Sequence, residues 1–133
     1  MLAKIVEPLI EWYEENHRIL PWRASKNPYY IWISEIMLQQ TRVEAVRPFF
    51  EQFIKALPKV EDVAVCPEEQ LLKLWEGLGY YNRVRNIQKA AVCIVKEYGG
   101  RLLADYEKLK ELPGIGNYTA GAVASIAYDL PVP

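Results

Sequence analysis

The fold of this chain is decided by a turn-forming stretch between two helical segments, Leu112-Pro113-Gly114-Ile115-Gly116-Asn117-Tyr118-Thr119-Ala120-Gly121-Ala122. Its proline and two glycines predict a hairpin turn, because proline interrupts a helix and glycine adopts left-handed backbone angles without strain. We expect Gly114 and Gly116 to take such angles, and residues 117–128 to form an alanine-rich second helix. Uncovered backbone N–H groups beside the positive end of that helix dipole would bind a phosphate without a basic side chain. The alternative is an ordinary connection between two helices.

Outward from the hairpin, apolar residues recur with helical periodicity, and no segment alternates in the manner of a β-strand. The fold class is therefore all-α, a compact bundle of seven or eight helices. Thr41 and Glu44 have the form of a capping box, and Pro48 predicts a kink or a late start in the next helix. The expected helices cover residues 2–15, a segment around Glu35 ending near Gln40, residues 43–57, a turn or helix near 60–65, and residues 67–76, 84–98, 105–110 and 117–128, with a loop over 19–28.

One carboxylate interrupts an almost unbroken apolar and aromatic run, Tyr29 to Thr41, with Glu35 at its middle. Burial penalises the ionised form of a carboxyl group and raises its pKa. A glutamic acid that stays protonated near neutral pH is what a general acid requires. An outward-facing glutamate on a mostly buried helix is the alternative, and the spacing alone favours it.

Three short segments carry side chains suited to contact with nucleic acid. Trp22-Arg23, in a loop fixed by prolines, suits either stacking and anion contact or simple packing. Two tyrosines are followed closely by two arginines in Gly79-Tyr80-Tyr81-Asn82-Arg83-Val84-Arg85, which suits stacking on bases and contact with phosphates. A core aromatic beside a solvated face explains that segment equally simply. The amides of Gln39-Gln40-Thr41 can occupy space in a base stack, although such a pair alone indicates little.

Composition restricts the class of protein. The 133 residues predict one domain, and 51% hydrophobic residues argue against a disordered chain. A formal charge of -1 excludes a uniformly basic nucleic-acid binder but allows a local basic face. Cys66 and Cys93 match no metal-ligand spacing and are interpreted as reduced thiols rather than a disulfide. No leader or membrane-span pattern is found, so we expect a soluble intracellular protein.

Four motifs in this order resemble the helix-hairpin-helix DNA glycosylase superfamily, and the resemblance covers essentially the whole chain. They are Leu20–Arg23, Ser34–Thr41, Trp75–Arg83 and Leu112–Ala120. The resemblance implies a six-helix barrel domain over residues 19–133, with the helix-hairpin-helix at about 105–128. Residues 1–18 would form an N-terminal helix that belongs with the iron–sulfur half of the full-length family.

The resemblance also implies a function, base-excision DNA repair. The motifs are most similar to the branch that hydrolyses the N-glycosidic bond of adenine mispaired with 8-oxoguanine or guanine, after flipping the adenine out of the duplex. Glu35 would match the general acid that protonates the purine ring. Tyr118 occupies the active-site position where bifunctional relatives carry a lysine nucleophile. A tyrosine cannot form a Schiff base, which favours a monofunctional glycosylase.

The implied partner is double-stranded DNA containing a mispaired adenine, with no membrane. By the same resemblance, Gln40 and Tyr80 would wedge into the base stack, and Gly114 and Gly116 would allow the DNA backbone to approach closely. Thr41, Arg83, Arg85 and Thr119 complete the expected DNA-binding set. The adenine pocket would be lined by Arg18, Leu20, Trp22, Arg23 and Val43.

Sugar–base bonds cleaved through an oxocarbenium-like state typically need a second carboxyl group. The family's aspartate lies just beyond the hairpin helix, whereas this chain stops at Pro131-Val132-Pro133 and Asp129 does not match that position. We therefore expect the chain alone to be inactive and to self-associate through uncovered apolar surface. No cofactor is expected in it, because the cysteine ligands of the family's [4Fe-4S] cluster lie beyond residue 133. The expected location is the cytoplasm and nucleoid of a bacterium, or a eukaryotic nucleus.

Three alternatives stay open. An endonuclease III-like glycosylase acting on damaged pyrimidines is disfavoured by the tyrosine at position 118 and by the Tyr80-Tyr81 pair. A non-catalytic helix-hairpin-helix module would bind DNA weakly, without sequence preference and with strong salt sensitivity. A purely structural helical domain would leave the glycine hairpin and the Tyr–Arg segment without a purpose.

Overall fold

The computed structural model describes residues 27–39 and 41–128, and in these ranges the chain is helical with no β-strand. The all-α fold class is confirmed, while the six-helix barrel stays a prediction. The expected helix at 2–15 and the loop up to residue 26 lie outside the described residues. The described helices are α2 (Pro28–Leu38), α3 (Val43–Ala56), α4 (Val60–Val65), α5 (Glu68–Trp75), α6 (Asn82–Tyr98), α7 (Tyr106–Lys110) and α8 (Asn117–Ala122), followed by a π-helical turn, η2 (Val123–Ala127).

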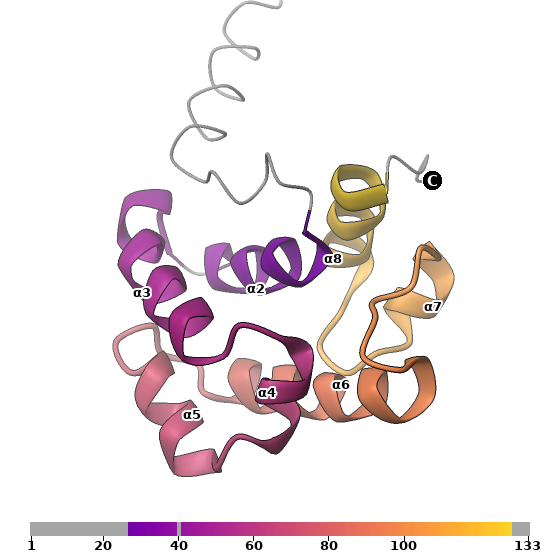
Figure 1. The fold of residues 1–133 in the computed structure, drawn as a ribbon. Coiled ribbons are helices and arrows are strands. Elements are labelled where there is room, and N and C mark those ends of the chain that lie inside the picture. The colour runs from indigo at the N-terminus through magenta and orange to yellow at the C-terminus, as the bar shows by residue number, and fades with distance from the viewer. Residues whose placement is uncertain (1–26, 40, 129–133) are drawn as a thin grey trace, which may run out of the picture.

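Helix α2 lies at the centre of this arrangement, between α3 on one side and α8 on the other (Figure 1). Eight of its eleven residues are buried, so the helix is covered on all its faces. The side chain of Asn27 caps it by accepting hydrogen bonds from the backbone N–H groups of Tyr29 (3.0 Å) and Tyr30 (3.3 Å). Pro28 is the first helical residue rather than the last loop residue, because its missing N–H would have no helical partner there.

Helix α3 covers one side of α2 with its predicted apolar stripe, of which Val46, Phe50 and Phe53 are buried. The helix runs through Pro48 without interruption, so a late start is the wrong expectation. Pro48 is exposed, which lets water hydrate the carbonyl group that loses its helical partner. The predicted capping box is also wrong, since the N-cap is Arg42 and no side chain caps this helix.

Helices α4, α5 and α6 form the layer below α2 in Figure 1, with α4 packed against α6 and α5 packed against both α3 and α6. The short helix expected near residues 60–65 is confirmed as α4. Pro67 is the N-cap of α5 rather than its first residue. Asp105 caps α7, accepting a 3.1 Å hydrogen bond from the backbone N–H of Lys108.

The hairpin between α7 and α8 is closed by a 3.1 Å hydrogen bond from the N–H of Ile115 to the carbonyl of Leu112. Gly114 has the expected left-handed angle, φ +74°, and a Cβ atom there would lie 2.9 Å from Cβ of Asn86 in α6. The left-handed angle expected at Gly116 is wrong, because this residue is extended with φ -91°. A side chain would have open space there. The hairpin therefore needs one glycine for its backbone angle and for contact with α6.

The second helix of the hairpin is less regular than expected, because α8 changes after Ala122 into the π-helical turn η2. Ala120, Val123 and Ala124 on its shared face are buried, as the alanine-rich pattern predicts. Both α8 and η2 pack against α2. None of the helices in residues 27–39 and 41–128 is long and apolar enough to cross a membrane.

Candidate functional site

Glu35 lies on the buried central helix, with 2% of its surface exposed. The outward-facing position that the spacing favoured is therefore wrong: every face of α2 is enclosed by the packing of α3, α8 and η2. Glu35 lines a pocket of about 340 Å³, whose other described lining residues all belong to α8 and η2. They are Asn117, Tyr118, Gly121, Ala122, Ser125 and Ile126.

Several other residues that line this pocket carry groups that donate or accept protons. Tyr118 lines the pocket and is 75% exposed. Asn117 and Ser125 add an amide and a hydroxyl group, and both were missed by the sequence reasoning. Asn117 lies four residues before Gly121 and Ser125 lies four residues after it. This helical spacing is the sequence signal that could have shown that the three residues share one face.

A hydrogen bond ties the helix of Glu35 to the hairpin helix. The amide nitrogen of Gln39 donates to the hydroxyl oxygen of Thr119 at 3.2 Å. Thr119 is 1% exposed, so its hydroxyl is engaged inside the molecule and holds α8 against the end of α2. The side chain of Gln39 therefore helps to hold the second helix of the hairpin in place.

The loop between α5 and α6 presents Tyr80 to solvent, with 66% of its surface exposed. Its φ angle of +51° is the one left-handed non-glycine conformation among the described residues. Such a conformation is strained for an aromatic residue and is found often at functional positions. The indole N–H of Trp75 donates a 3.1 Å hydrogen bond to the carbonyl of Gly79, which anchors the loop to the core.

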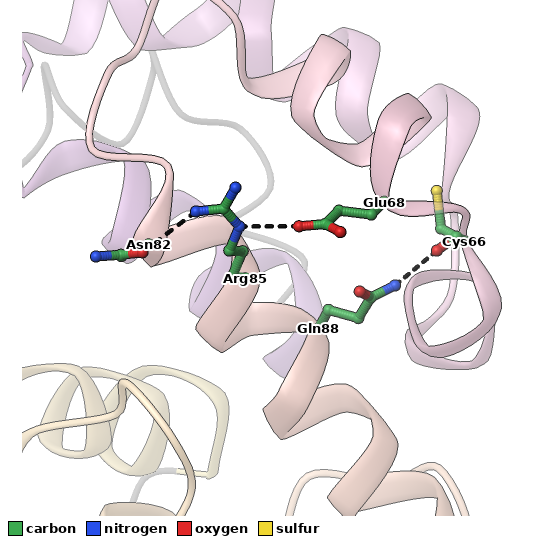
Figure 2. A network of polar contacts seen from close by, with 5 residues as sticks. All are labelled: Cys66, Glu68, Asn82, Arg85 and Gln88. Atoms are coloured by element: carbon green, nitrogen blue, oxygen red, sulfur yellow. Dashed lines mark hydrogen bonds and ion pairs between the residues drawn. The ribbon is translucent and has the colours of Figure 1, made fainter.

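The two arginines of the Tyr–Arg segment differ in their surroundings. The guanidinium of Arg85 donates to a carboxylate oxygen of Glu68 at 2.9 Å and to the side-chain oxygen of Asn82 at 3.4 Å (Figure 2). In the next turn, Gln88 donates a 2.6 Å hydrogen bond to the carbonyl of Cys66. This network joins α6 to the start of α5 and occupies the Arg85 side chain.

Arg83 is not part of that network. Its guanidinium carbon lies 5.6 Å from the ring centroid of Tyr80, which is cation–π geometry. Among the described residues it makes no ion pair. The arginine that faces the exposed tyrosine is therefore the one without a carboxylate partner in this part of the chain.

Several predicted site residues cannot be placed. Arg18, Leu20, Trp22, Arg23 and Gln40 lie outside the described residues, as does the side chain of Val43. Thr41, which precedes α3, is half-buried.

Three described groups, Tyr29, Cys66 and Tyr128, have a raised pKa. Burial, and then the negative charge of Asp62, raise the pKa of Tyr29 far above its usual range. The Tyr29 hydroxyl donates a 2.6 Å hydrogen bond to the carbonyl of Leu57. Burial also raises the pKa of the Cys66 thiol and of the Tyr128 phenol. These groups have structural roles.

A four-cysteine cluster does not fit this chain. Its sequence contains two cysteines, Cys66 and Cys93, and both are free thiols. Within residues 27–39 and 41–128, no three histidine, cysteine, aspartate or glutamate side chains come together as a metal site.

The model of the HhH-GPD superfamily of base excision DNA repair proteins matches residues 33–130. Adenine DNA glycosylase of Buchnera aphidicola subsp. Baizongia pistaciae is 43% identical over 125 residues, which are 93% of this chain and 36% of that protein. The mouse (Mus musculus) adenine DNA glycosylase is 42% identical over 130 residues, 91% of this chain and 25% of that protein. The chain thus spans about a quarter to a third of the length of these relatives.

Solved structures show the same fold. A thermostable thymine-DNA glycosylase matches with a TM-score of 0.77 at 30% identity, over 83% of this chain and 51% of that chain. A non-covalent endonuclease III–DNA complex matches with a TM-score of 0.74 at 25% identity, over 94% of this chain and 61% of that chain.

Proposed function

Because the chain belongs to the HhH-GPD superfamily of base excision DNA repair proteins, we propose that it carries the acid of an adenine DNA glycosylase. The substrate is adenine mispaired with 8-oxoguanine or guanine in double-stranded DNA. The observation that carries this proposal is the burial of Glu35 in a pocket whose other described lining comes from the hairpin helix. The names of the relatives at 42–43% identity support adenine as the base removed.

In the proposed reaction, the adenine leaves the duplex and Glu35 donates a proton to its ring. Protonation turns the base into a better leaving group, and the sugar develops oxocarbenium character. Burial supports this role, because an apolar environment disfavours the ionised form of a carboxyl group. Tyr118, which lines the same pocket, cannot form a Schiff base, so water completes the hydrolysis.

Glu35 is the one carboxylate among the described residues that line this pocket. Charge stabilisation of the sugar normally needs a second carboxylate. We propose that the 133 residues by themselves release adenine very slowly or not at all.

The surface that would meet DNA combines the exposed tyrosine of the α5–α6 loop with the hairpin. Tyr80 would enter the base stack together with Gln40, and the backbone of Gly114 and Gly116 would approach a phosphate. The exposure of Tyr80 and the open space at Gly116 support this arrangement. Arg83 and Arg85, near the start of α6, would contribute positive charge.

Replacing Glu35→Gln in a protein that contains this chain tests the proposal. Single-turnover excision from an adenine:8-oxoguanine duplex should fall by about 100-fold or more, while duplex binding stays within a few-fold, since general acid catalysis contributes about that much. Glu44→Gln, an exposed glutamate on α3, is the matched control and should leave excision unchanged. Unaltered excision in the Glu35 variant would remove this residue from the mechanism.

Damaged-pyrimidine excision is the second candidate, because endonuclease III is among the structural matches. A lysine-based enzyme forms a covalent intermediate that borohydride traps, whereas a tyrosine at position 118 predicts no trapped product. Trapping on a duplex with an oxidised pyrimidine would favour the second candidate.

A further inference from the structure

Gly121 is the one glycine of this chain that lies within a described helix. The sequence contains seven glycines, and the structure places the other six in turns or loops. Five of those six have a left-handed φ angle, which explains the choice of glycine there. Gly121 has no such angle, and helical residues follow it up to Ala127. Glycine inside a helix is destabilising relative to alanine, so its presence needs another reason.

Close packing between helices does not supply that reason. Apart from the helix's own backbone and the two adjacent residues, one described atom lies within 4 Å of a Cβ atom built at Gly121. It is Cε2 of the Tyr106 ring, at 3.8 Å, which is an ordinary van der Waals distance. No described atom of α2 comes that near, although α8 packs against α2. An alanine at position 121 would therefore fit the described part of the fold.

The missing side chain instead faces the pocket of Glu35. Gly121 lines this pocket of about 340 Å³. Its neighbours on the helix surface, Asn117, Tyr118 and Ser125, line it as well. Since residues three and four positions apart share a helix face, a Cβ atom added at Gly121 points toward the same cavity. A methyl group there would take up part of the open space that Glu35 also borders.

The π-helical turn η2 keeps the wall of the pocket in line with Gly121. In a regular α-helix, every fourth residue is rotated by about 40° from the one before, so a face made of such residues drifts around the helix. A π-helical turn bonds five residues back and rotates less per residue, which reduces this drift. Ser125 and Ile126, four residues after Gly121 and Ala122, remain on the pocket side. The pocket wall is therefore continuous, with bare backbone at its centre.

We propose that Gly121 determines how closely an extruded base approaches Glu35. The flat ring of the base lies against the bare backbone of α8, where a side chain would hold it away from the carboxyl group. Proton transfer needs donor and acceptor within hydrogen-bond reach, so a displacement of about 1 Å slows the reaction strongly. Gly121 is thus a specificity-determining residue, which acts through the position of the base. This inference rests on the proposed excision of a base by Glu35.

The variant Gly121→Ala tests this role in a protein that contains this chain. Single-turnover excision of adenine opposite 8-oxoguanine should slow by on the order of 10- to 100-fold, and Gly121→Val should slow it further. The urea midpoint of Gly121→Ala should stay equal or rise, because alanine favours the helix. Excision at the unaltered rate would overturn the proposal. A lowered midpoint or a failure to fold would also overturn it, since the glycine would then serve packing.

Two duplexes separate entry of the base from binding of the DNA backbone. One carries 2′-fluoro-2′-deoxyadenosine, which resists excision, and the other carries a tetrahydrofuran unit without a base, each opposite 8-oxoguanine. Gly121→Ala should weaken binding of the first duplex by about 10-fold, the scale of one methylene group in a pocket, and leave binding of the second within about two-fold. Equal losses on both duplexes, or no loss on either, would contradict the role of Gly121.

The role of Gly121 and the proposed function fail separately. Loss of excision in Glu35→Gln together with unaltered excision in Gly121→Ala rejects the role of Gly121 and leaves the proposed function intact. Unaltered excision in Glu35→Gln rejects the proposed function, while the two duplexes still show whether Gly121 admits a base to this pocket.

Discussion

The amide of Gln39 donates a 3.2 Å hydrogen bond to the hydroxyl of Thr119, although 80 residues separate them along the chain. This bond connects the helix that carries Glu35 with the helix that carries Tyr118. Gln39 also lines a pocket formed by residues of α2, α6 and the hairpin turn, and Thr119 directly follows Tyr118, which lines the Glu35 pocket. The relative position of the two pockets is thus fixed by a polar contact as well as by apolar packing.

Thr119→Val should destabilise the chain by about 1 kcal/mol, because it removes the acceptor of this bond while keeping the size of the buried side chain. Urea unfolding followed by circular dichroism measures the change. Thr41→Val, at a half-buried threonine before α3, is the control and should alter the unfolding free energy by less than about 0.5 kcal/mol. Equal stabilities of the two variants would show that the bond contributes nothing.

Gly114→Ala should be more destabilising than Gly116→Ala. At position 114 a Cβ atom combines a left-handed backbone with a 2.9 Å approach to Cβ of Asn86, which predicts a loss of about 2 kcal/mol or more. At position 116 the backbone is extended and the space is open, so the loss should stay below about 1 kcal/mol. Denaturant midpoints compare the pair. The reverse order would contradict the geometry of the hairpin.

Tyr80→Gly should maintain or raise stability while weakening duplex binding. Glycine relieves the left-handed strain, worth about 1 kcal/mol, and the exposed ring loses little packing. Tyr81→Gly is the matched control, because Tyr81 has a right-handed helical backbone and glycine there should lower stability by about 1 kcal/mol. Unfolding and DNA-binding titrations on both variants separate the two effects. A large loss of stability in Tyr80→Gly would show that the ring is structural.

Tyr29 should make the fold sensitive to alkaline pH. Its pKa is raised by burial in the folded chain, whereas the unfolded chain releases this proton near pH 10. The stabilisation is therefore fully present below pH 10 and declines as the pH rises above 10, by up to about 1.4 kcal/mol per pH unit. Urea unfolding at pH 9 and pH 11 measures this decline.

Tyr29→Phe should lose part of the alkaline decline, and about 1 kcal/mol of stability at pH 7 together with the bond to Leu57. Tyr118→Phe, which removes an exposed phenol, should retain the decline of the unaltered chain. Identical slopes in the Tyr29 variant and the unaltered chain would contradict the role of burial.

Helical periodicity predicted the class of fold because it follows directly from which side chains must be buried. The apolar stripe of α3 and the helix near residues 60–65 are local features, and both are found as expected. The capping box at Thr41 failed because the sequence pattern does not show where the chain turns into α3, which begins one residue too late for Thr41 to cap it.

The candidate site was predictable only in part. Glu35 could be singled out as a carboxylate in an apolar run, but its burial depends on α3, α8 and η2 surrounding α2, which no local pattern contains. Gly114 was predictable from turn chemistry, while its contact with Asn86 depends on the packing of α6. The sequence does not indicate that the indole N–H of Trp32 is unpaired, because this depends on the neighbours that the fold places around it.

Because α2 is enclosed on every face, it should be among the last segments of the chain to unfold. Partial unfolding exposes the least buried segments first, and a central helix becomes accessible only when the surrounding helices separate. The backbone amides of Ile33 to Met37 should therefore exchange with deuterium only through global unfolding. Local fluctuations that loosen the Tyr80 loop or the hairpin would therefore leave Glu35 in its position on α2. Glu35 would keep that position until the whole fold unfolds.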